Sequence, residues 1–245
     1  MLNLFANDYL EFLEKNNASK KEIEAIYKKY WKCYSVRMNC VQSCINDKEY
    51  DQALKYLDKC IKLDYKDQSL LKRDIEMKKD IYQKQGNREG YREMMKALIL
   101  DFRDTGIEEY IELKNFYTSE EWVEERDSII KQINSDWFLC AIYAEEKLYK
   151  QLLDSIVKSN DKRLLVQYTD LLKDKYPKQL LHMYRVAVEK EAERASNRSY
   201  YRQLVQDLRV MKCITGGDKV VDEIIKKWKN QYKKRTAMMD ELSRL

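Results

Sequence analysis

The stretch YDQALKYLDKCI, residues 50–61, decides the fold class of this 245-residue chain. Its apolar residues recur three and four positions apart, the spacing that places side chains on one face of an α-helix. The charged residues between them fall on the opposite face. We therefore predict an amphipathic helix that packs on other helices through a stripe formed by Tyr50, Ala53, Leu54, Leu57, Cys60 and Ile61.

Helices with the same pattern continue on both sides of this stretch. Ser19 and Glu22 form a capping box that starts a helix, as do Thr118 and Glu121. Helical hairpins are predicted over 36–63 with a turn at Asn46-Asp47, over 70–99 with a turn at Gly86-Asn87, and over 107–133 with a turn at Thr118-Ser119. No run of alternating polarity predicts a strand. The chain is therefore predicted to be all-α.

The ends of the chain follow the same pattern. A first helix is predicted over 7–14, and further helices over 137–146, 149–157, 161–174, 177–195, 220–232 and 236–245. Pro177 is placed at the first turn of its helix, where proline is tolerated. Ser196-Asn197 begins the helix that follows, and Gly216-Gly217 is predicted to end it as a left-handed C-cap.

The spacing Tyr50-x2-Ala53-x3-Leu57-x2-Cys60 resembles the second helix of a tetratricopeptide (TPR) repeat, in which a small residue allows close helix contact. Arg37, Cys40 and Val41 stand where the first helix of that repeat has its signature residues. The resemblance implies an α-α superhelix, a TPR-like solenoid of antiparallel helical hairpins. Residues 1–245 would form a single array with a soft boundary near 134–136, between generic hairpins (1–133) and the remainder (137–245); Asp174 to Pro177 is another soft boundary.

The region from Leu139 to Leu245 resembles the C-terminal helical region of bacterial SWIM zinc-finger proteins. The motifs that carry this are AIYAEE at 141–146, YPKQLLHMY at 176–184, ASNRSYYR at 195–202, Gly216-Gly217 and MMDEL at 238–242. The zinc motif of that family, Cys-x-Cys followed by Cys-x-His, is absent. The resemblance thus implies an interaction scaffold, either a C-terminal piece of a longer protein or a stand-alone relative, in a nucleic-acid-processing context.

Charge and composition argue for a cytoplasmic protein. The 47 basic and 42 acidic residues give a net charge of +5 and are finely interspersed, so no strong field is expected over most of the surface. No stretch has the apolar length needed to cross a bilayer, and the acidic N-terminus lacks the features of a signal peptide. All six cysteines lie at apolar positions of helical patterns, where free cysteine acts as a small hydrophobe.

No catalytic, metal or cofactor site is predicted. Cys33, Cys40 and Cys44 could share a helix face, but structural zinc wants four ligands in closely spaced pairs. His182 is the only histidine, and no glycine-rich loop is present to cradle phosphates. Neighbouring carboxylates such as Glu120-Glu121 are typical of a solvated face. The protein is therefore interpreted as a non-enzyme; a hydrolase would require a cleft with a cluster of perturbed carboxylates.

Two binding surfaces are candidates. A protein or peptide partner, or another part of the parent chain, would bind exposed side chains of the helical array, for which we select Tyr168, Arg198, Tyr200 and Arg202. The alternative is a nucleic-acid-binding module in residues 219–235, where Trp228 and Tyr232 are interleaved with Lys219, Lys226, Lys227, Lys229, Lys233, Lys234 and Arg235. The same aromatics fit an apolar stripe, which favours the scaffold.

Overall fold

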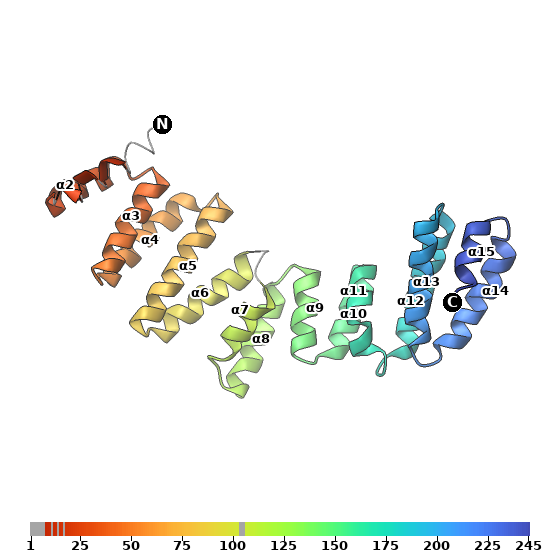
Figure 1. Cartoon of the computed structure of the whole chain (residues 1–245). Helices are drawn as coiled ribbons and strands as arrows, with labels where there is room; N and C mark the ends of the chain where they lie inside the picture. Colours follow the sequence, from red (N-terminus) through yellow and green to blue (C-terminus); the bar gives the residue numbers. More distant parts are fainter. Residues whose placement is uncertain (1–7, 11, 14, 17, 103–105) are drawn as a thin grey trace. The chain divides into compact units, whose positions relative to one another are not determined.

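A computed structural model describes residues 8–10, 12–13, 15–16, 18–102 and 106–245. These residues form helices and no strand, which confirms the all-α prediction (Figure 1). They belong to two compact units, Met1–Ile133 and Asn134–Leu245. The division lies beside the boundary placed at 134–136 from the sequence, whereas Asp174 to Pro177 lies within the second unit.

The first unit contains helices that pack on their neighbours in chain order. They are α2 (Lys20–Lys29), α3 (Tyr34–Asn46), α4 (Tyr50–Asp64), α5 (Gln68–Gln85), α6 (Arg88–Asp101), α7 (Ile107–Lys114) and α8 (Ser119–Gln132). The predicted hairpin turns fall between α3 and α4, between α5 and α6, and between α7 and α8. The helix predicted over 7–14 is described only in part, because Asn7, Glu11 and Glu14 lie outside the described residues.

Local signals in the sequence explain where these helices begin and end. Both capping boxes are formed, Ser19 with Glu22 at α2 and Thr118 with Glu121 at α8. Gly86 adopts a left-handed conformation (φ 67°) at the end of α5, a backbone geometry that glycine reaches without a steric penalty. The chain therefore reverses direction where the sequence predicted it.

The core of the first unit is built from the predicted stripe. Ala53, Leu57 and Cys60 of α4 are completely buried. Ala53 packs in one cluster with Val41 and Cys44 of α3 and Ile81 of α5. Farther along the chain, an aromatic contact joins α7 to α8, where the Tyr110 and Trp122 rings meet edge to face at 5.1 Å.

The second unit has a single extended hydrophobic cluster. Its helices are α9 (Asp136–Glu145), α10 (Tyr149–Ser159), α11 (Lys162–Leu172), α12 (Pro177–Arg194), α13 (Arg198–Lys212), α14 (Gly217–Gln231) and α15 (Thr236–Leu242). Pro177 occupies the first turn of α12, and Asn197 caps α13, as predicted. Tyr184 is fully buried, and its hydroxyl lies 2.8 Å from that of Thr169.

The prediction for Gly216-Gly217 was wrong in its position. Helix α13 ends at Lys212, and Gly216 is left-handed (φ 83°) as the N-cap of the next helix, α14. A Cβ on Gly217 would lie 1.8 Å from the Met211 carbonyl oxygen, so this position accepts only glycine. The glycine pair thus serves the close approach of α14 to the end of α13.

No helix among the described residues is long and apolar enough to span a membrane.

Candidate binding groove

The first unit carries a hollow between α2, α3 and α4, with a volume of about 1230 Å³. Its lining is mixed in character. Four lysines (Lys20, Lys28, Lys48, Lys55) face four carboxylates (Glu24, Asp47, Glu49, Asp51). Between them lie carboxamide, tyrosine and other side chains, namely Asn39, Gln42, Asn46, Gln52, Gln85, Ile23, Tyr27, Tyr50 and Tyr56.

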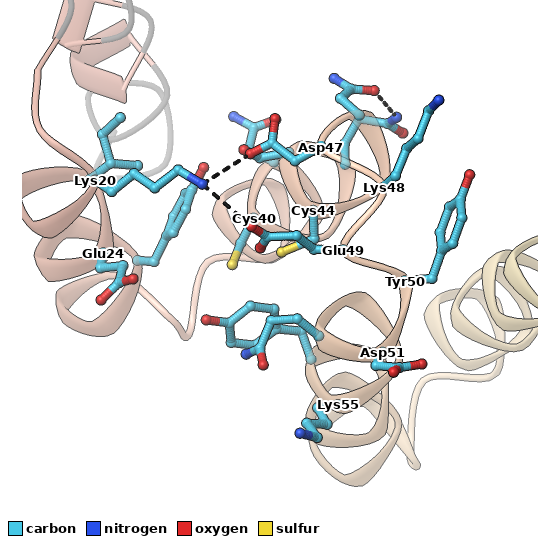
Figure 2. Close-up of a pocket in the computed structure, with 18 of the residues that line it drawn as sticks. Lys20, Glu24, Cys40, Cys44, Asp47, Lys48, Glu49, Tyr50, Asp51 and Lys55 are labelled. Atoms are coloured by element: carbon cyan, nitrogen blue, oxygen red, sulfur yellow. Dashed lines mark hydrogen bonds and ion pairs between the residues drawn. The ribbon is translucent and has the colours of Figure 1, made fainter.

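The rim of this hollow is closed on one side by Lys20. Its ammonium reaches from α2 to the loop between α3 and α4, where it lies 3.5 Å from Asp47 Oδ2 and 3.3 Å from Glu49 Oε1 (Figure 2). The hydrogen bond with Glu49 is the main cause that raises the Lys20 pKa, followed by the charges of Glu49 and Asp47. All three side chains are exposed, so solvent screens the contact and it holds α2 only weakly.

Cys40 and Cys44 lie one turn apart on α3, and both line the hollow (Figure 2). Both are buried. Burial raises the pKa of the Cys40 thiol to about 12 and also raises that of Cys44. A thiol held in its neutral form is a poor nucleophile and a poor metal ligand. These cysteines therefore serve as small apolar side chains in the wall of the hollow, as the sequence predicted.

A second hollow of about 460 Å³ lies on the α5 side of α3. Its lining from α5 consists of Arg73, Glu76, Met77 and Asp80, and α3 contributes Tyr34, Met38, Asn39 and Gln42. Asn39 and Gln42 line both hollows. The two hollows therefore adjoin across α3, and we call this continuous surface the α3 groove.

A buried charge cluster adjoins the smaller hollow of the α3 groove, because the ring of Tyr34, which lines that hollow, lies 5.4 Å from the Arg37 guanidinium. Arg37 of α3 donates from Nη2 to both carboxylate oxygens of Asp64 in α4, to Oδ1 at 2.7 Å. Its Nη1 donates to the carbonyls of Trp31 and Lys32, each at 3.2 Å. Arg37 thus connects α4 to the segment that follows α2. Sequence reasoning noted Arg37 only as a departure from the TPR pattern.

Asp74 of α5 completes this cluster and is completely buried. Neither of its carboxyl oxygens receives a hydrogen bond within the described part of the chain. Burial, followed by the charge of the adjacent Asp64, raises the pKa of Asp74 to about 7. A perturbed carboxyl of this kind marks catalytic sites only where substrate can touch it. Asp74 has no exposed surface, so the hydrolase hypothesis gains nothing from it.

The residues selected from the sequence for partner binding belong to the second unit, whereas the α3 groove belongs to the first. Tyr168 is only 8% exposed and is a core residue, so it offers a partner almost no surface. Tyr200 is 60% exposed. Arg198 lies 2.8 Å from Asp240, and Arg202 lies 3.4 Å from Glu241. These two arginines therefore attach α13 to α15 rather than stand free.

The basic segment 219–235 contains buried, paired and exposed residues. Trp228 is 1% exposed and belongs to the core, so it cannot stack on a base. Arg235 donates to the carbonyls of Ala192 and Ala195 at 2.7 and 3.1 Å, which caps the end of α12. Lys227 pairs with Glu189 at 3.2 Å. The lysines that stay exposed without such a tie are Lys219, Lys226, Lys229, Lys233 and Lys234.

Within the described residues, no group of three or more His, Cys, Asp or Glu side chains is arranged to hold a metal ion. His182 is exposed on α12. The prediction that every cysteine lies at an apolar position was wrong for Cys213, which follows the last turn of α13 and is exposed, and Cys33 is only half-buried.

The groove residues were missed because sequence reasoning followed apolar stripes. Asn39 and Gln42 lie beside the stripe of α3, and their amide type was the available signal. No protein-family model matches the sequence, and no curated protein matches it. The resemblance to SWIM proteins stays a prediction that rests on the quoted motifs.

Proposed function

We propose that this chain is a non-catalytic, TPR-like helical-repeat scaffold that binds an extended segment of another protein in the α3 groove. The observation that carries the proposal is the pair of adjoining hollows, which share Asn39 and Gln42. A carboxamide offers a donor and an acceptor together, as a peptide bond does. Gln42 already donates from Nε2 to Asn46 Oδ1 at 2.9 Å, so it offers its carbonyl oxygen and its second amide hydrogen to the backbone of an extended peptide.

The charges of the groove distinguish a peptide from a nucleic acid. The larger hollow has equal numbers of lysines and carboxylates, and the smaller one has Arg73 against Glu76 and Asp80. Nucleic-acid binding rests on a surplus of basic groups that neutralise phosphates. A groove of balanced charge instead suits a peptide of mixed sequence, whose own charges pair with both signs.

The test uses a displayed library of random twelve-residue peptides, selected on the full chain. A selected peptide is then titrated against the double variant Asn39→Ala, Gln42→Ala. We expect its affinity to fall at least tenfold, because each lost amide leaves peptide backbone groups unpaired (about 1–3 kcal/mol each). The matched control is Gln167→Ala on the exposed face of α11, which should leave the affinity unchanged.

Two outcomes would contradict the proposal. One is a selection that yields no peptide; the other is a peptide whose affinity is the same for the double variant and for the wild type. A single-stranded oligothymidine serves as the opposing probe. Salt-dependent binding of this probe that is lost when Lys226, Lys229, Lys233 and Lys234 are changed to Glu would support the nucleic-acid alternative instead.

A further inference from the structure

The buried cluster beside the α3 groove contains one cation, Arg37, and two carboxyl groups, those of Asp64 and Asp74. Arg37 is engaged with Asp64 and with two backbone carbonyls. Asp74 lies against Asp64, and neither Asp74 oxygen receives a hydrogen bond from a described residue. Two ionised carboxylates side by side in a buried site repel each other. The contact becomes favourable when one of them carries a proton and donates it to the other.

We infer that Asp64 and Asp74 share one proton while α3, α4 and α5 are packed together, so that loss of this proton loosens the helix packing beside the α3 groove. The inference rests on the proposed function for its consequence, the control of peptide binding by pH. The three charged side chains come from three different helices: Arg37 from α3, Asp64 from α4 and Asp74 from α5. A change in their charge therefore acts on the packing of all three.

The surroundings of Asp74 favour its protonated form. Burial is the largest cause that raises its pKa, Asp64 raises it further, and the Arg37 charge lowers it. No group of α6, which also packs on α5, is among these causes for the described residues. The titratable and charged groups near the cluster are Tyr34 and Arg37 on α3, Cys60 and Asp64 on α4, and Arg73 beside Asp74 on α5.

The direction of the pH effect follows from the raised pKa. An aspartate in the unfolded or locally opened chain loses its proton near its usual pKa of 3.8, whereas packed Asp74 keeps it up to about 7. Between these values the packed state binds one more proton than the open state, so packing weakens as the pH rises. Above about pH 7 both states are ionised, and the effect levels off.

The groove responds because two of its lining residues, Tyr34 and Arg73, adjoin the cluster. Tyr34 lines the second hollow, and its ring lies 5.4 Å from the Arg37 guanidinium. Arg73, which lines the same hollow, directly precedes Asp74 on α5. Helix α3, which carries Asn39 and Gln42, is attached to α4 through Arg37 and Asp64. Loosening of the cluster therefore disturbs the groove where the peptide is proposed to bind.

The chain contains its own probes for this opening. Cys60 of α4 is completely buried beside the cluster, and Cys140 of α9 is equally buried in the second unit. Each thiol reacts with N-ethylmaleimide only after local opening. If labelling is slow relative to reclosing, its rate follows the open population. The ratio of the Cys60 rate to the Cys140 rate, measured by mass spectrometry, cancels the pH dependence of thiol chemistry.

For the wild-type chain, this ratio should rise about tenfold per pH unit between pH 5 and 6.5 and level off above about pH 7. In Asp74→Asn the ratio should stay flat, because the amide is neutral at every pH and donates to Asp64. Asp101→Asn, at an exposed position of α6 that lines neither hollow, should behave as the wild type. An equal slope in the wild type and in Asp74→Asn would overturn the inference.

This measurement needs no peptide, so its failure is distinguishable from failure of the proposed function. A second arm tests the link to the groove. The affinity of a selected peptide should be about ten times higher at pH 5.5 than at pH 7.5 in the wild type, and the same at both in Asp74→Asn. An affinity that does not change in the wild type would overturn the regulatory part of the inference.

Discussion

Each unit of this protein contains a cation with two carboxyl groups near it, and the two clusters differ in their access to water. In the first unit, buried Arg37 bonds Asp64 but not Asp74, and both acids are buried. In the second unit, Lys162 of α11 bonds Asp207 of α13 and lies 2.6 Å from Glu191 of α12.

The difference lies in the second acid. The side chain of Glu191 is 43% exposed, so water solvates its charge, whereas Asp74 has no exposure at all. Burial also raises the pKa of Asp207, but the hydrogen bond from Lys162 opposes this shift, whereas Asp74 receives no hydrogen bond from a described residue. Solvent access to the second carboxyl group, Asp74 in one unit and Glu191 in the other, therefore affects the pH sensitivity of the packing more than the number of ion pairs does.

The largest effect is expected from removal of the cation in the first unit. Arg37→Met leaves buried Asp64 without its partner and two backbone carbonyls without a donor. We expect a loss of about 3–5 kcal/mol in the free energy of unfolding of α3–α5. Lys162→Met should lower that of α11–α13 by about 2 kcal/mol, because Glu191 remains hydrated. Native-state hydrogen exchange, resolved by unit, measures both. Equal losses in the two units would break the comparison.

At pH 8 the substitutions Asp74→Asn and Asp207→Asn should change the free energy of unfolding of their units in opposite directions. Asp74→Asn removes a buried charge that has no cation of its own, and should raise the stability of the first unit by about 1–2 kcal/mol. Asp207→Asn removes the buried partner of Lys162, and should lower the stability of the second unit by about 1–3 kcal/mol. Denaturant melts followed by unit-resolved hydrogen exchange give the signs. A destabilised Asp74→Asn variant would contradict the account.

The half-exposed acid should contribute least. Glu191→Gln removes an ion pair that solvent already screens, so the stability of the second unit should change by about 0.5 kcal/mol or less. Addition of 1 M NaCl should reproduce this small loss in the wild type and have no further effect in the variant. A loss as large as that of Asp207→Asn would show that Glu191 behaves as a buried group.

The sequence predicts best what depends on neighbouring residues. The capping box at the start of α8 was predicted correctly because Thr118 and Glu121 lie within one helical turn. The start of α12 was predicted correctly because it depends on Pro177 alone. The Arg37–Asp64 pair spans 27 residues and joins two helices, so no local pattern reveals it. Gly217 was misplaced for a similar reason, since its need for glycine comes from the Met211 carbonyl across a loop.

The groove shows the same limit. The apolar stripe of α4 could be predicted from spacing, and the burial of Ala53, Leu57 and Cys60 agrees with it. Asn39 and Gln42 line both hollows only because α2 and α5 lie on either side of α3. Tyr168, chosen from composition, is a core residue whereas Tyr200 is 60% exposed, because tyrosine content alone does not say which rings face water.

The most direct test is a titration of the aspartate carboxyl groups in the full chain by carbon-13 NMR, with Asp74→Asn used to assign the signals. The account predicts one signal from the Asp64–Asp74 pair with a midpoint near pH 7, absent from the spectrum of the variant. If every aspartate of the first unit titrates below about pH 5, the packed cluster holds no proton and the account is wrong.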